Sequence, residues 1–459
     1  MRGAVDNVTS AIGRTPIVRI NSLARDVASE IFVKLEYMNP GGSMKDRVAV
    51  QIINDAERKG QLKPGGVIVE ATSGNTGMGL AMVAATRGYQ CIFVMPDKMS
   101  QEKVASLRAF GARVVICPTA VEPEDPRSYY SVSRRLVDET PGAFYANQYH
   151  NPSNPEAHYL STAPEIWEQT GGELDVFVAG MGTGGTISGC GRYFKEKKPG
   201  FRVVGVDPIG SLYYEYVKTG RMTRPFSYYV EGIGEDFLPG TMNLKLIDQI
   251  VRVDDKECFL MTRDLVRSEG IYAGGSSGAA VAGAIKYARE SGRKENILVL
   301  LPDSAQKYLS KIFDDKWMRE NGFLEEEDEL GTVAQMIRGR ERAVVTVSLG
   351  TTVRKAISLM KEHGISQLPV LDERGRLSGI VAEVDLLQCL VKGEGRLDQP
   401  VDDLVEADYQ TVTPATRVVL LKTIFSEAKL ICVLDRDELI GVITKIDLID
   451  FLATRLGAA

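Results

Sequence analysis

The sequence NPGGSMKDR, residues 39–47, decides how the N-terminal part of this chain folds. The alternating apolar run at residues 31–36 predicts a β-strand before it, and residues 48–56 carry apolar side chains at helical spacing after it. Lys45 is therefore predicted in the first turn of a helix. There the helix dipole and unpaired N–H groups disfavour an ammonium and lower its pKa. Such a lysine suits Schiff-base chemistry, and the alternative is an ordinary solvated lysine at a helix start.

Downstream of this turn, strand-like and helix-like patterns alternate. Alternation of this kind predicts an α/β fold with twisted, mostly parallel sheets covered by helices on both faces. In such sheets, ligands bind at the loops that leave the carboxyl ends of the strands. The predicted strands are residues 67–71, 91–95, 112–117, 175–179, 202–206 and 296–300, and helix-like runs include 78–85, 101–110 and 279–288.

The first such loop is TSGNTG, residues 72–77, which has two glycines, three hydroxyl side chains and one amide. Glycine lets a ligand approach the backbone, and the N–H groups and hydroxyls suit a carboxylate. The alternative is helix capping, because serine and threonine beside glycine commonly start a helix.

The second loop is GTGGT, residues 182–186, between a predicted strand and a predicted helix. Its successive N–H groups and two hydroxyls form a phosphate cradle. A second interpretation stays open, because residues 180–185 also match G-x-G-x-x-G and Asp207 stands where a ribose-binding acid belongs. That interpretation predicts a dinucleotide-dependent dehydrogenase. The hydroxyl-rich composition favours a single phosphate ester.

The third loop is AGGSSG, residues 273–278, ahead of a helix-like run. It is either another helix cap with glycines for close packing, or a site that brings one short hydroxyl against a ligand atom.

Composition excludes several other classes of protein. A net charge of −6 over 459 residues argues against nucleic-acid binding, and no apolar run is long enough for a membrane span or a signal peptide, so a cytoplasmic protein is expected. The six scattered cysteines contain no C-x-x-C, and there are only three histidines (150, 158 and 363). A disulfide framework, a metal site and a Ser-His-Asp hydrolase are therefore disfavoured. An organic cofactor is the expected source of the chemistry.

Taken together and in this order, Lys45 and the three loops resemble the pyridoxal-phosphate enzymes of the tryptophan synthase β type (fold type II). Among these, the motifs are most similar to those of the cystathionine β-synthase family. The resemblance covers about residues 5–320, and it implies that fold and pyridoxal 5′-phosphate as the cofactor.

The resemblance also implies roles for individual residues. Lys45 forms the Schiff base with the cofactor and is the base that removes the substrate α-proton, Asn75 hydrogen-bonds the ring oxygen, and Ser276 faces the pyridine nitrogen. The phosphate is held by Gly182, Thr183, Gly184, Gly185 and Thr186, and the substrate carboxylate by Thr72, Ser73, Thr76 and Gln148.

The reaction that the resemblance implies is β-replacement, in which L-serine and L-homocysteine give L-cystathionine and water, a step of transsulfuration. A serine hydroxyl at the pyridine nitrogen makes a weaker electron sink than a carboxylate would, which favours replacement at the β-carbon over transamination. The alternative is a cysteine synthase that uses O-acetylserine and sulfide on the same scaffold.

Two features favour the first reaction. Tyr149 stands where cysteine synthases usually have phenylalanine, and Glu231 and Glu235 lie in a glycine-flanked loop where a carboxylate suits the amino group of a second amino acid. The animal enzymes have tyrosine at the position of Glu235, so its role stays open. No cysteine precedes Cys91 and no histidine precedes His150, so no haem is predicted. The family implies a homodimer.

The C-terminal part carries a tandem repeat. Residues 368–381 recur as 431–443, and each copy runs into an Asp-Leu pair, at Asp385 and at Asp447, 62 residues apart. The repeat resembles the paired CBS domains of a Bateman module. The predicted domains are a catalytic domain at 1–322, an acidic linker at 323–340, and CBS domains at 341–396 and 397–457.

In that family, a threonine three residues before an aspartate helps to bind a ribose. Thr444 and Asp447 fit this pattern, whereas Ala382 takes the threonine position in the first copy. The resemblance thus implies an adenosyl effector, S-adenosylmethionine or an adenine nucleotide, in the second copy. The alternatives are a structural dimerisation module with an empty cleft, or a chain that only senses such a ligand and has no catalysis.

Overall fold

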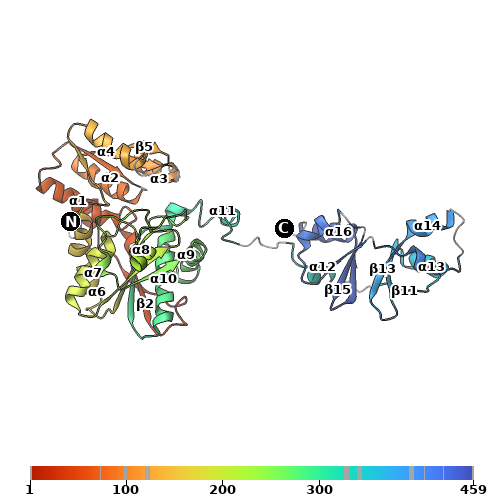
Figure 1. Cartoon of the computed structure of the whole chain (residues 1–459). Coiled ribbons are helices and arrows are strands. Elements are labelled where there is room, and N and C mark those ends of the chain that lie inside the picture. Colours follow the sequence, from red (N-terminus) through yellow and green to blue (C-terminus); the bar gives the residue numbers. More distant parts are fainter. Residues whose placement is uncertain are drawn as a thin grey trace. The chain divides into compact units, whose positions relative to one another are not determined.

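The structure is a computed structural model, and it divides into two compact units, Met1–Glu325 and Glu326–Ala459. Each unit is described by itself (Figure 1). Within the described part of the chain, no helix is both long and apolar enough to cross a bilayer. The described residues are 3–72, 74–97, 99, 101–118, 121, 125–324, 330–338, 344–391, 397–407, 409–426, 428 and 430–456.

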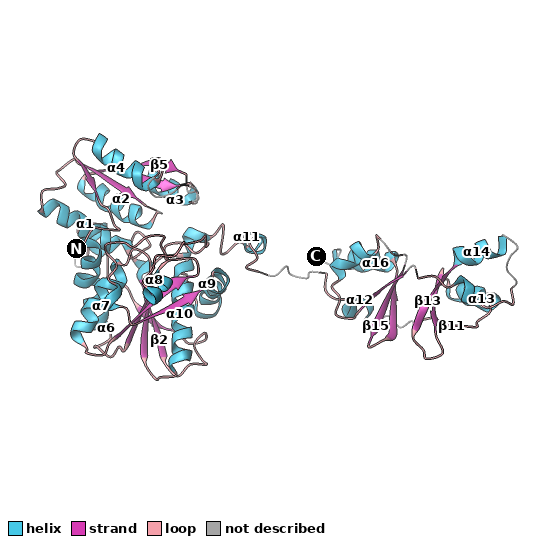
Figure 2. Cartoon of the chain, viewed as in Figure 1, coloured by secondary structure: helices cyan, strands magenta, loops and turns pink. Residues whose placement is uncertain are grey.

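The larger sheet of the N-terminal unit has six strands in the order β1-β2-β10-β7-β8-β9, and only β1 is antiparallel to its neighbour. Successive residues of β7 point to opposite faces: Val176 and Val178 enter one core, and Phe177 and Ala179 enter the other. Figure 2 shows α6 and α7 on one side of this sheet and α9 and α10 on the other. The strands are β1 (Ile17–Arg19), β2 (Glu30–Leu35), β7 (Val176–Gly180), β8 (Arg202–Pro208), β9 (Gln249–Val253) and β10 (Asn296–Leu301).

A second, all-parallel sheet has the order β5-β4-β3-β6 and forms its own lobe with α2, α3 and α4 (Figure 1). Phe93 and Met95 of β4 pack with α1, α2 and α3, whereas Ile92 and Val94 face α4. The strands are β3 (Val67–Ala71), β4 (Gln90–Pro96), β5 (Arg113–Cys117) and β6 (Ala143–Tyr145).

The helices of this unit follow the strands in the alternating order that the pattern predicted. The α/β class with helices on both faces of mostly parallel sheets is therefore confirmed. The short strands β1, β6 and β9 were not predicted. The helices are α1 (Lys45–Arg58), α2 (Asn75–Arg87), α3 (Gln101–Ala109), α4 (Tyr129–Glu139), α5 (Ser153–Ala157), α6 (Ala163–Gln169), α7 (Gly185–Lys197), α8 (Tyr213–Thr219), α9 (Asp255–Glu269), α10 (Gly275–Ser291) and α11 (Asp315–Glu320).

The C-terminal unit contains two three-stranded sheets with the same construction. In each, the first pair of strands is parallel, the second pair is antiparallel, and the antiparallel pair shifts register at one point, at Val370/Leu371 and at Val433/Leu434. The elements are β11 (Val347–Ser348), β12 (Gln367–Leu371), β13 (Leu377–Ala382), α13 (Val353–His363) and α14 (Glu383–Val391), then β14 (Tyr409–Val412), β15 (Leu430–Asp435), β16 (Glu438–Ile443), α15 (Leu421–Ile424) and α16 (Lys445–Leu456).

The short helix α12 (Val333–Ile337) belongs to the core of the second repeat. Val333 donates its N–H to Thr416 O at 2.8 Å, and Val333 and Met336 are buried in the cluster that contains Val418. This helix lies inside residues 323–340, the range assigned to the linker from sequence. The sequence signal is Thr332 with Gln335, a capping box before an apolar pair. The acidic run 325–329 lies outside the described residues.

Candidate active site

Lys45 is the first residue of α1, as its sequence context predicted. The turn before it is held against the loop that follows β10. Ser43 pairs with Asp303 in an antiparallel bridge, and the N–H of Met44 donates to Pro302 O at 2.9 Å. A Cβ added at Gly79 would lie 2.9 Å from Lys45 O, so α2 crosses this turn at a distance that only glycine permits. The lysine is thus anchored from two directions.

The Lys45 amine has a lowered pKa of about 8. Burial is the largest cause, and the carboxylates of Asp303 and Glu235 act against it. The lowered pKa was predicted from the helix dipole, whereas in the structure its largest cause is the burial of the amine. A lysine with this pKa supplies a substantial fraction of neutral amine near pH 8, which is the form that reacts with an aldehyde.

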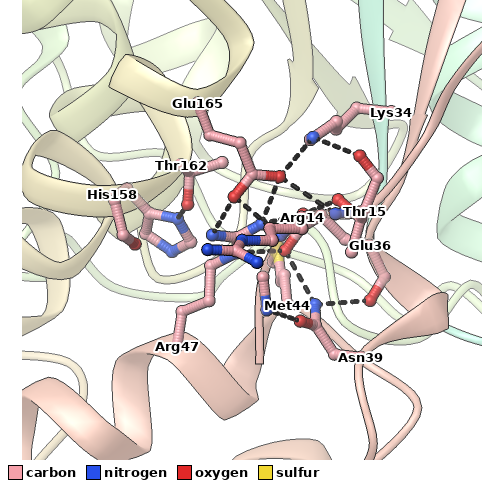
Figure 3. Close-up of polar contacts among 12 residues, drawn as sticks. Arg14, Thr15, Lys34, Glu36, Asn39, Met44, Arg47, His158, Thr162 and Glu165 are labelled. Carbon is pink, nitrogen blue, oxygen red and sulfur yellow. Dashed lines mark hydrogen bonds and ion pairs between the residues drawn. The ribbon is translucent and has the colours of Figure 1, made fainter. Parts of the chain in front are cut away.

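Behind Lys45 lies a buried ionic cluster, the Arg47 network, made of Lys34, Glu36, Arg47 and Glu165 (Figure 3). Arg47 donates from Nε and Nη2 to the two oxygens of Glu36 at 2.8 Å each, and from Nη1 to Glu165 at 2.9 Å. The fully buried Lys34 donates to Glu165 at 2.5 Å. The network ties β2, α1 and α6 together and fixes the start of α1.

The network explains two further residues of the NPGGSMKDR motif. Asn39 donates to Glu36 O at 2.8 Å and accepts the N–H of Gly13 at 2.8 Å. Asp46 accepts the N–H of Gly41 at 2.6 Å. The residues around Lys45 therefore hold the shape of the turn. Glu36 and Glu165 were not predicted as parts of the site.

The TSGNTG loop connects β3 to α2. The Thr72 hydroxyl accepts the N–H groups of Gly74 at 3.0 Å and Gly77 at 3.2 Å, which is a capping role. Thr76 donates to the side-chain oxygen of Gln148 at 2.5 Å, so these two predicted substrate contacts lie together. The other predicted contact of this loop, Ser73, lies outside the described residues.

Glu70 lies beneath this loop on β3 and is only 1% exposed. Its Oε1 accepts the N–H of Gln148 at 3.2 Å, and its Oε2 has no hydrogen-bond partner among the described residues. Burial raises the pKa of Glu70 to about 8, against the effect of the N–H groups of Gln148 and Asn147. At neutral pH, Glu70 is therefore mostly a neutral acid that supports Gln148.

This buried acid gives a pH-dependent prediction. Because the folded pKa of about 8 lies above the ordinary value of 4.5, ionisation of Glu70 lowers the stability of the wild type as the pH rises through that interval, and this contribution is absent in Glu70→Gln. We expect the free energy of unfolding of the variant to gain on the wild type by roughly 3 kcal/mol between about pH 5 and pH 8. Urea denaturation of both proteins at a series of pH values measures this difference in the free energy of unfolding. Glu168→Gln, at an exposed glutamate, is the control. A difference in the free energy of unfolding between Glu70→Gln and the wild type that stays constant with pH would contradict the raised pKa of Glu70.

The GTGGT loop leads into α7 and is built to accept an anion. Gly184 is the N-cap with φ +86°, no side chain caps the helix, and the first turn has no acidic residue. The first N–H groups of a 13-residue helix are therefore open to a ligand. A Cβ at Gly185 would lie 1.9 Å from Asn154 Oδ1, so the loop has no room for a side chain at this position. The residues present fit a phosphate.

Other side chains support this loop from behind. Tyr213 donates to Gly182 O at 2.7 Å, and Asn154 donates to the Thr183 hydroxyl at 3.1 Å. Thr186 contacts both Met44 Sδ at 3.3 Å and His158 Nε2 at 3.1 Å. The loop thus lies next to the residue that precedes Lys45.

His158 opens a π-helical turn, His158–Thr162, and is fully buried. Its Nδ1 lies 2.9 Å from the Thr162 hydroxyl, which places the ring between Thr162 and Thr186 (the contact with Thr162 is drawn in Figure 3). Burial keeps the pKa of His158 well below its ordinary value, and the charges of Lys45 and Arg47 add to this effect. The imidazole is neutral, so it orients the Thr186 hydroxyl by hydrogen bonding and does not supply charge.

The structure does not support the dinucleotide interpretation of this loop, because Asp207 is not available to bind a ribose. Asp207 is completely buried, and one of its oxygens accepts the N–H of Tyr214 at the start of α8 at 2.9 Å. An aspartate in this position caps a helix and does not face a ribose.

The third loop and Asp303 complete the site. Ser276 lies in the first turn of α10, whose N-terminus has no side-chain cap, and it is 3% exposed. The N–H of Gly274 donates to Asp303 O at 2.9 Å, and the Asn75 amide donates to Asp303 Oδ2 at 2.8 Å. Asp303 therefore joins the Lys45 turn, the TSGNTG loop and the third loop. A cavity of about 450 Å³ opens beside Asn75, and Gly42, Lys103 and Lys307 contribute to its lining.

Glu231, predicted to receive an amino group, is engaged by two lysines. Its oxygens pair with Lys103 of α3 and with Lys311 at 2.7 Å. The two ammonium groups hold the pKa of Glu231 below its ordinary value despite its burial. An incoming ammonium would have to displace one of them. The pairing also joins α3 of the smaller lobe to the loop that carries Glu231.

Tyr149 lies in an aromatic cluster with Tyr130 and Phe237, whose ring centroids are 6.0 Å and 5.2 Å from its own. Burial keeps the pKa of the Tyr149 phenol well above its ordinary value, and the Glu235 carboxylate adds to this effect. The neutral phenol therefore remains a hydrogen-bond donor at physiological pH.

In the C-terminal unit, Thr444 and Asp447 contact each other at the start of α16. The hydroxyl and N–H of Thr444 donate to Asp447 Oδ2 at 2.5 Å and 2.7 Å. In the first repeat, Asp385 accepts the N–H of Ala382 at 3.1 Å, and Ala382 has no hydroxyl to add a second bond. The structure thus pairs the two predicted effector residues, and the pairing also starts the helix.

Comparison with known proteins identifies the family to which the chain belongs. The family model "Pyridoxal-phosphate dependent enzyme" matches residues 8–303, and a CBS domain model matches 333–392. The cystathionine beta-synthase of Dictyostelium discoideum is 38% identical over 98% of this chain and 92% of its own length. The chain belongs to the pyridoxal-phosphate dependent enzymes. Within them it is a member of the cystathionine β-synthase family, with CBS-domain architecture at its C-terminus.

Two other similar proteins match about two thirds of this chain. The cysteine synthase of Staphylococcus aureus (strain Mu50) is 43% identical over 68% of this chain and 98% of its own length. The crystal structure of the O-acetylserine dependent cystathionine beta-synthase from Helicobacter pylori superposes with a TM-score of 0.62, at 38% identity, over 67% of this chain and 98% of that one. The pyridoxal-phosphate enzyme predicted from the motifs is confirmed.

Proposed function

We propose that this enzyme condenses L-serine with L-homocysteine to give L-cystathionine and water. The observation that carries the proposal is the Lys45 amine, whose lowered pKa and anchored turn suit a covalent bond to an aldehyde, in a chain that matches cystathionine β-synthases over nearly its whole length. The similarity to the Staphylococcus aureus cysteine synthase supports cysteine synthesis from O-acetylserine and sulfide as the second candidate.

The residues present fit pyridoxal phosphate. We assign its aldehyde to Lys45, its ring oxygen to Asn75 and its ring nitrogen to Ser276. Pyridoxal phosphate, when bound, supplies the electron sink that stabilises negative charge at the substrate α-carbon. The phosphate is assigned to the uncapped start of α7, with Gly182, Thr183, Gly184, Gly185 and Thr186.

The protein itself orients the amino acid and moves one proton. Thr76 and Gln148, which contact each other, are assigned to the serine carboxylate together with Thr72 and Ser73. The Lys45 amine accepts the α-proton, the serine hydroxyl leaves Cβ and departs as water with the proton of the homocysteine thiol, the sulfur forms the new bond to Cβ, and Lys45 returns its proton to Cα. Tyr149 and Glu231 are assigned to the second substrate, Glu231 by exchange of one lysine partner.

The C-terminal module is proposed to regulate this activity. The paired Thr444 and Asp447 support a site for an adenosyl ligand in the second repeat, since a hydroxyl and a carboxylate suit a ribose. We also propose a homodimer, the assembly that the family resemblance implies.

The substrate pair is tested by one assay with two donors and two acceptors. With the donor saturating and the acceptor varied, we expect kcat/KM for L-homocysteine with L-serine to be at least about tenfold above that for sulfide with O-acetylserine, since a site for an amino acid gains contacts that sulfide cannot make. Product formation is followed by chromatography. If O-acetylserine and sulfide react far faster, the enzyme is a cysteine synthase.

A further inference from the structure

Asn75 is held between two charged side chains from the loop that follows β10. Lys307 Nζ donates to Asn75 Oδ1 at 2.6 Å, and Asn75 Nδ2 donates to Asp303 Oδ2 at 2.8 Å. An ammonium can only donate, and a carboxylate can only accept. These partners therefore fix which end of the amide faces each of them. A flipped amide would place its N–H groups against the Lys307 ammonium and its oxygen against the Asp303 carboxylate.

The arrangement leaves one donor of Asn75 for a ligand. The amide nitrogen has two hydrogens, and the one bond it makes to a described residue is that to Asp303. Asn75 borders the 450 Å³ cavity, together with Gly42 and Lys307. Its second N–H suits an acceptor oxygen in that cavity.

The two charged residues are themselves restrained. Lys307 also donates to Gly42 O at 3.3 Å, within the turn that carries Lys45. Asp303 is 1% exposed and accepts the Tyr308 hydroxyl at 2.7 Å. A Cβ at Gly274 would lie 2.3 Å from Asp303 Oδ1, so the carboxylate has no room to swing away. The clamp is rigid on both sides of the amide.

We infer that Lys307 and Asp303 are positioning residues for the cofactor, which hold the Asn75 amide with its free N–H toward the ring oxygen of bound pyridoxal phosphate. This rests on the cofactor assignment of the proposed function. The clamp acts through Asn75. Its effect falls on cofactor affinity and on the visible absorption of the bound cofactor.

The test compares Lys307→Met, Lys307→Arg and a matched control, Lys316→Met, on α11, where the ammonium is exposed and pairs with Glu320 one turn along the helix. Each full-length apoenzyme is titrated with pyridoxal phosphate, and the spectrum of each loaded protein is recorded from acid to alkaline pH. We expect Lys307→Met to bind roughly tenfold more weakly and to shift the pH dependence of the visible band, because Asn75 loses a charged donor. Lys307→Arg is expected to keep most of the wild-type cofactor affinity and most of the wild-type pH dependence of the visible band.

The melting temperature of each apoenzyme separates positioning from packing. A Lys307→Met protein that melts earlier but binds and absorbs as the wild type does would overturn the inference. If Lys307→Met does not fold, Asp303→Asn is the second variant, and it is expected to weaken binding because an amide there can present either end to Asn75. Wild-type affinity and spectrum in that variant would overturn the inference as well. A wild type that shows no visible band with pyridoxal phosphate would instead refute the proposed function.

Discussion

Lys45→Ala is expected to lower kcat for cystathionine formation by about 10³-fold or more and to leave the purified protein without the visible absorption of a covalently held cofactor. Two losses combine in this variant. The amine that carries the cofactor is gone, and so is the base that accepts the α-proton, a role that alone contributes about 10²- to 10⁴-fold in enzymes. Steady-state turnover and the absorption spectrum measure the two effects separately.

The matched control is Lys59→Ala, an exposed lysine at the other end of the same helix. It should leave turnover and spectrum unchanged, and both proteins should unfold at similar urea concentrations. Activity within tenfold of the wild type in Lys45→Ala would mean that another amine carries the cofactor.

Arg47→Met is expected to destabilise the N-terminal unit by about 3–5 kcal/mol. The substitution leaves two carboxylates, Glu36 and Glu165, without their main cation, and Glu36 is fully buried. A buried charge that loses its partner costs far more than the ion pair contributed, because the carboxylate keeps its desolvation penalty. Urea denaturation followed by tryptophan fluorescence is specific here, since Trp167 and Trp317, the two tryptophans of the chain, both lie in the N-terminal unit.

Arg58→Met, on the same helix, is the control for Arg47. The Arg58 side chain is 72% exposed, and its buried partner Asp55 keeps the hydrogen bonds from Gln51 and Ser153, so loss of the pair should cost less than about 1 kcal/mol. Equal unfolding curves for Arg47→Met and the wild type would show that the Arg47 network does not hold the active-site turn in place.

The sequence predicted the fold class and the position of Lys45 because both depend on local patterns. Strand and helix periodicity placed most of the parallel strands, and the first two glycine and hydroxyl loops lie at the carboxyl ends of β3 and β7, where α/β sheets bind ligands. The third loop, residues 273–278, was expected at such an end as well, but it connects α9 to α10. By the same rule, Asp303 and Lys307 could have been found, since they follow the predicted strand 296–300. They were overlooked because that loop has no glycine.

The ionic partners could not be predicted from the sequence. Arg47 meets Glu165 across 118 residues of chain, and nothing local to either residue indicates the pairing. Lys34 lies in a strand with alternating apolar residues, so the pattern puts it on a solvent face, whereas α6 covers that face and leaves the lysine 0% exposed. Glu231 was assigned to an incoming ammonium from its loop alone, and its two lysine partners come from α3 and from residue 311.

The central claim is tested most directly by trapping the bond between the protein and its cofactor. Sodium borohydride converts an imine between a lysine and the cofactor aldehyde into a stable secondary amine, and mass spectrometry of the digested holoenzyme then locates the phosphopyridoxyl group. The account predicts that group on Lys45. A label on another lysine, such as Lys307 beside Asn75, or no label at all, would contradict it.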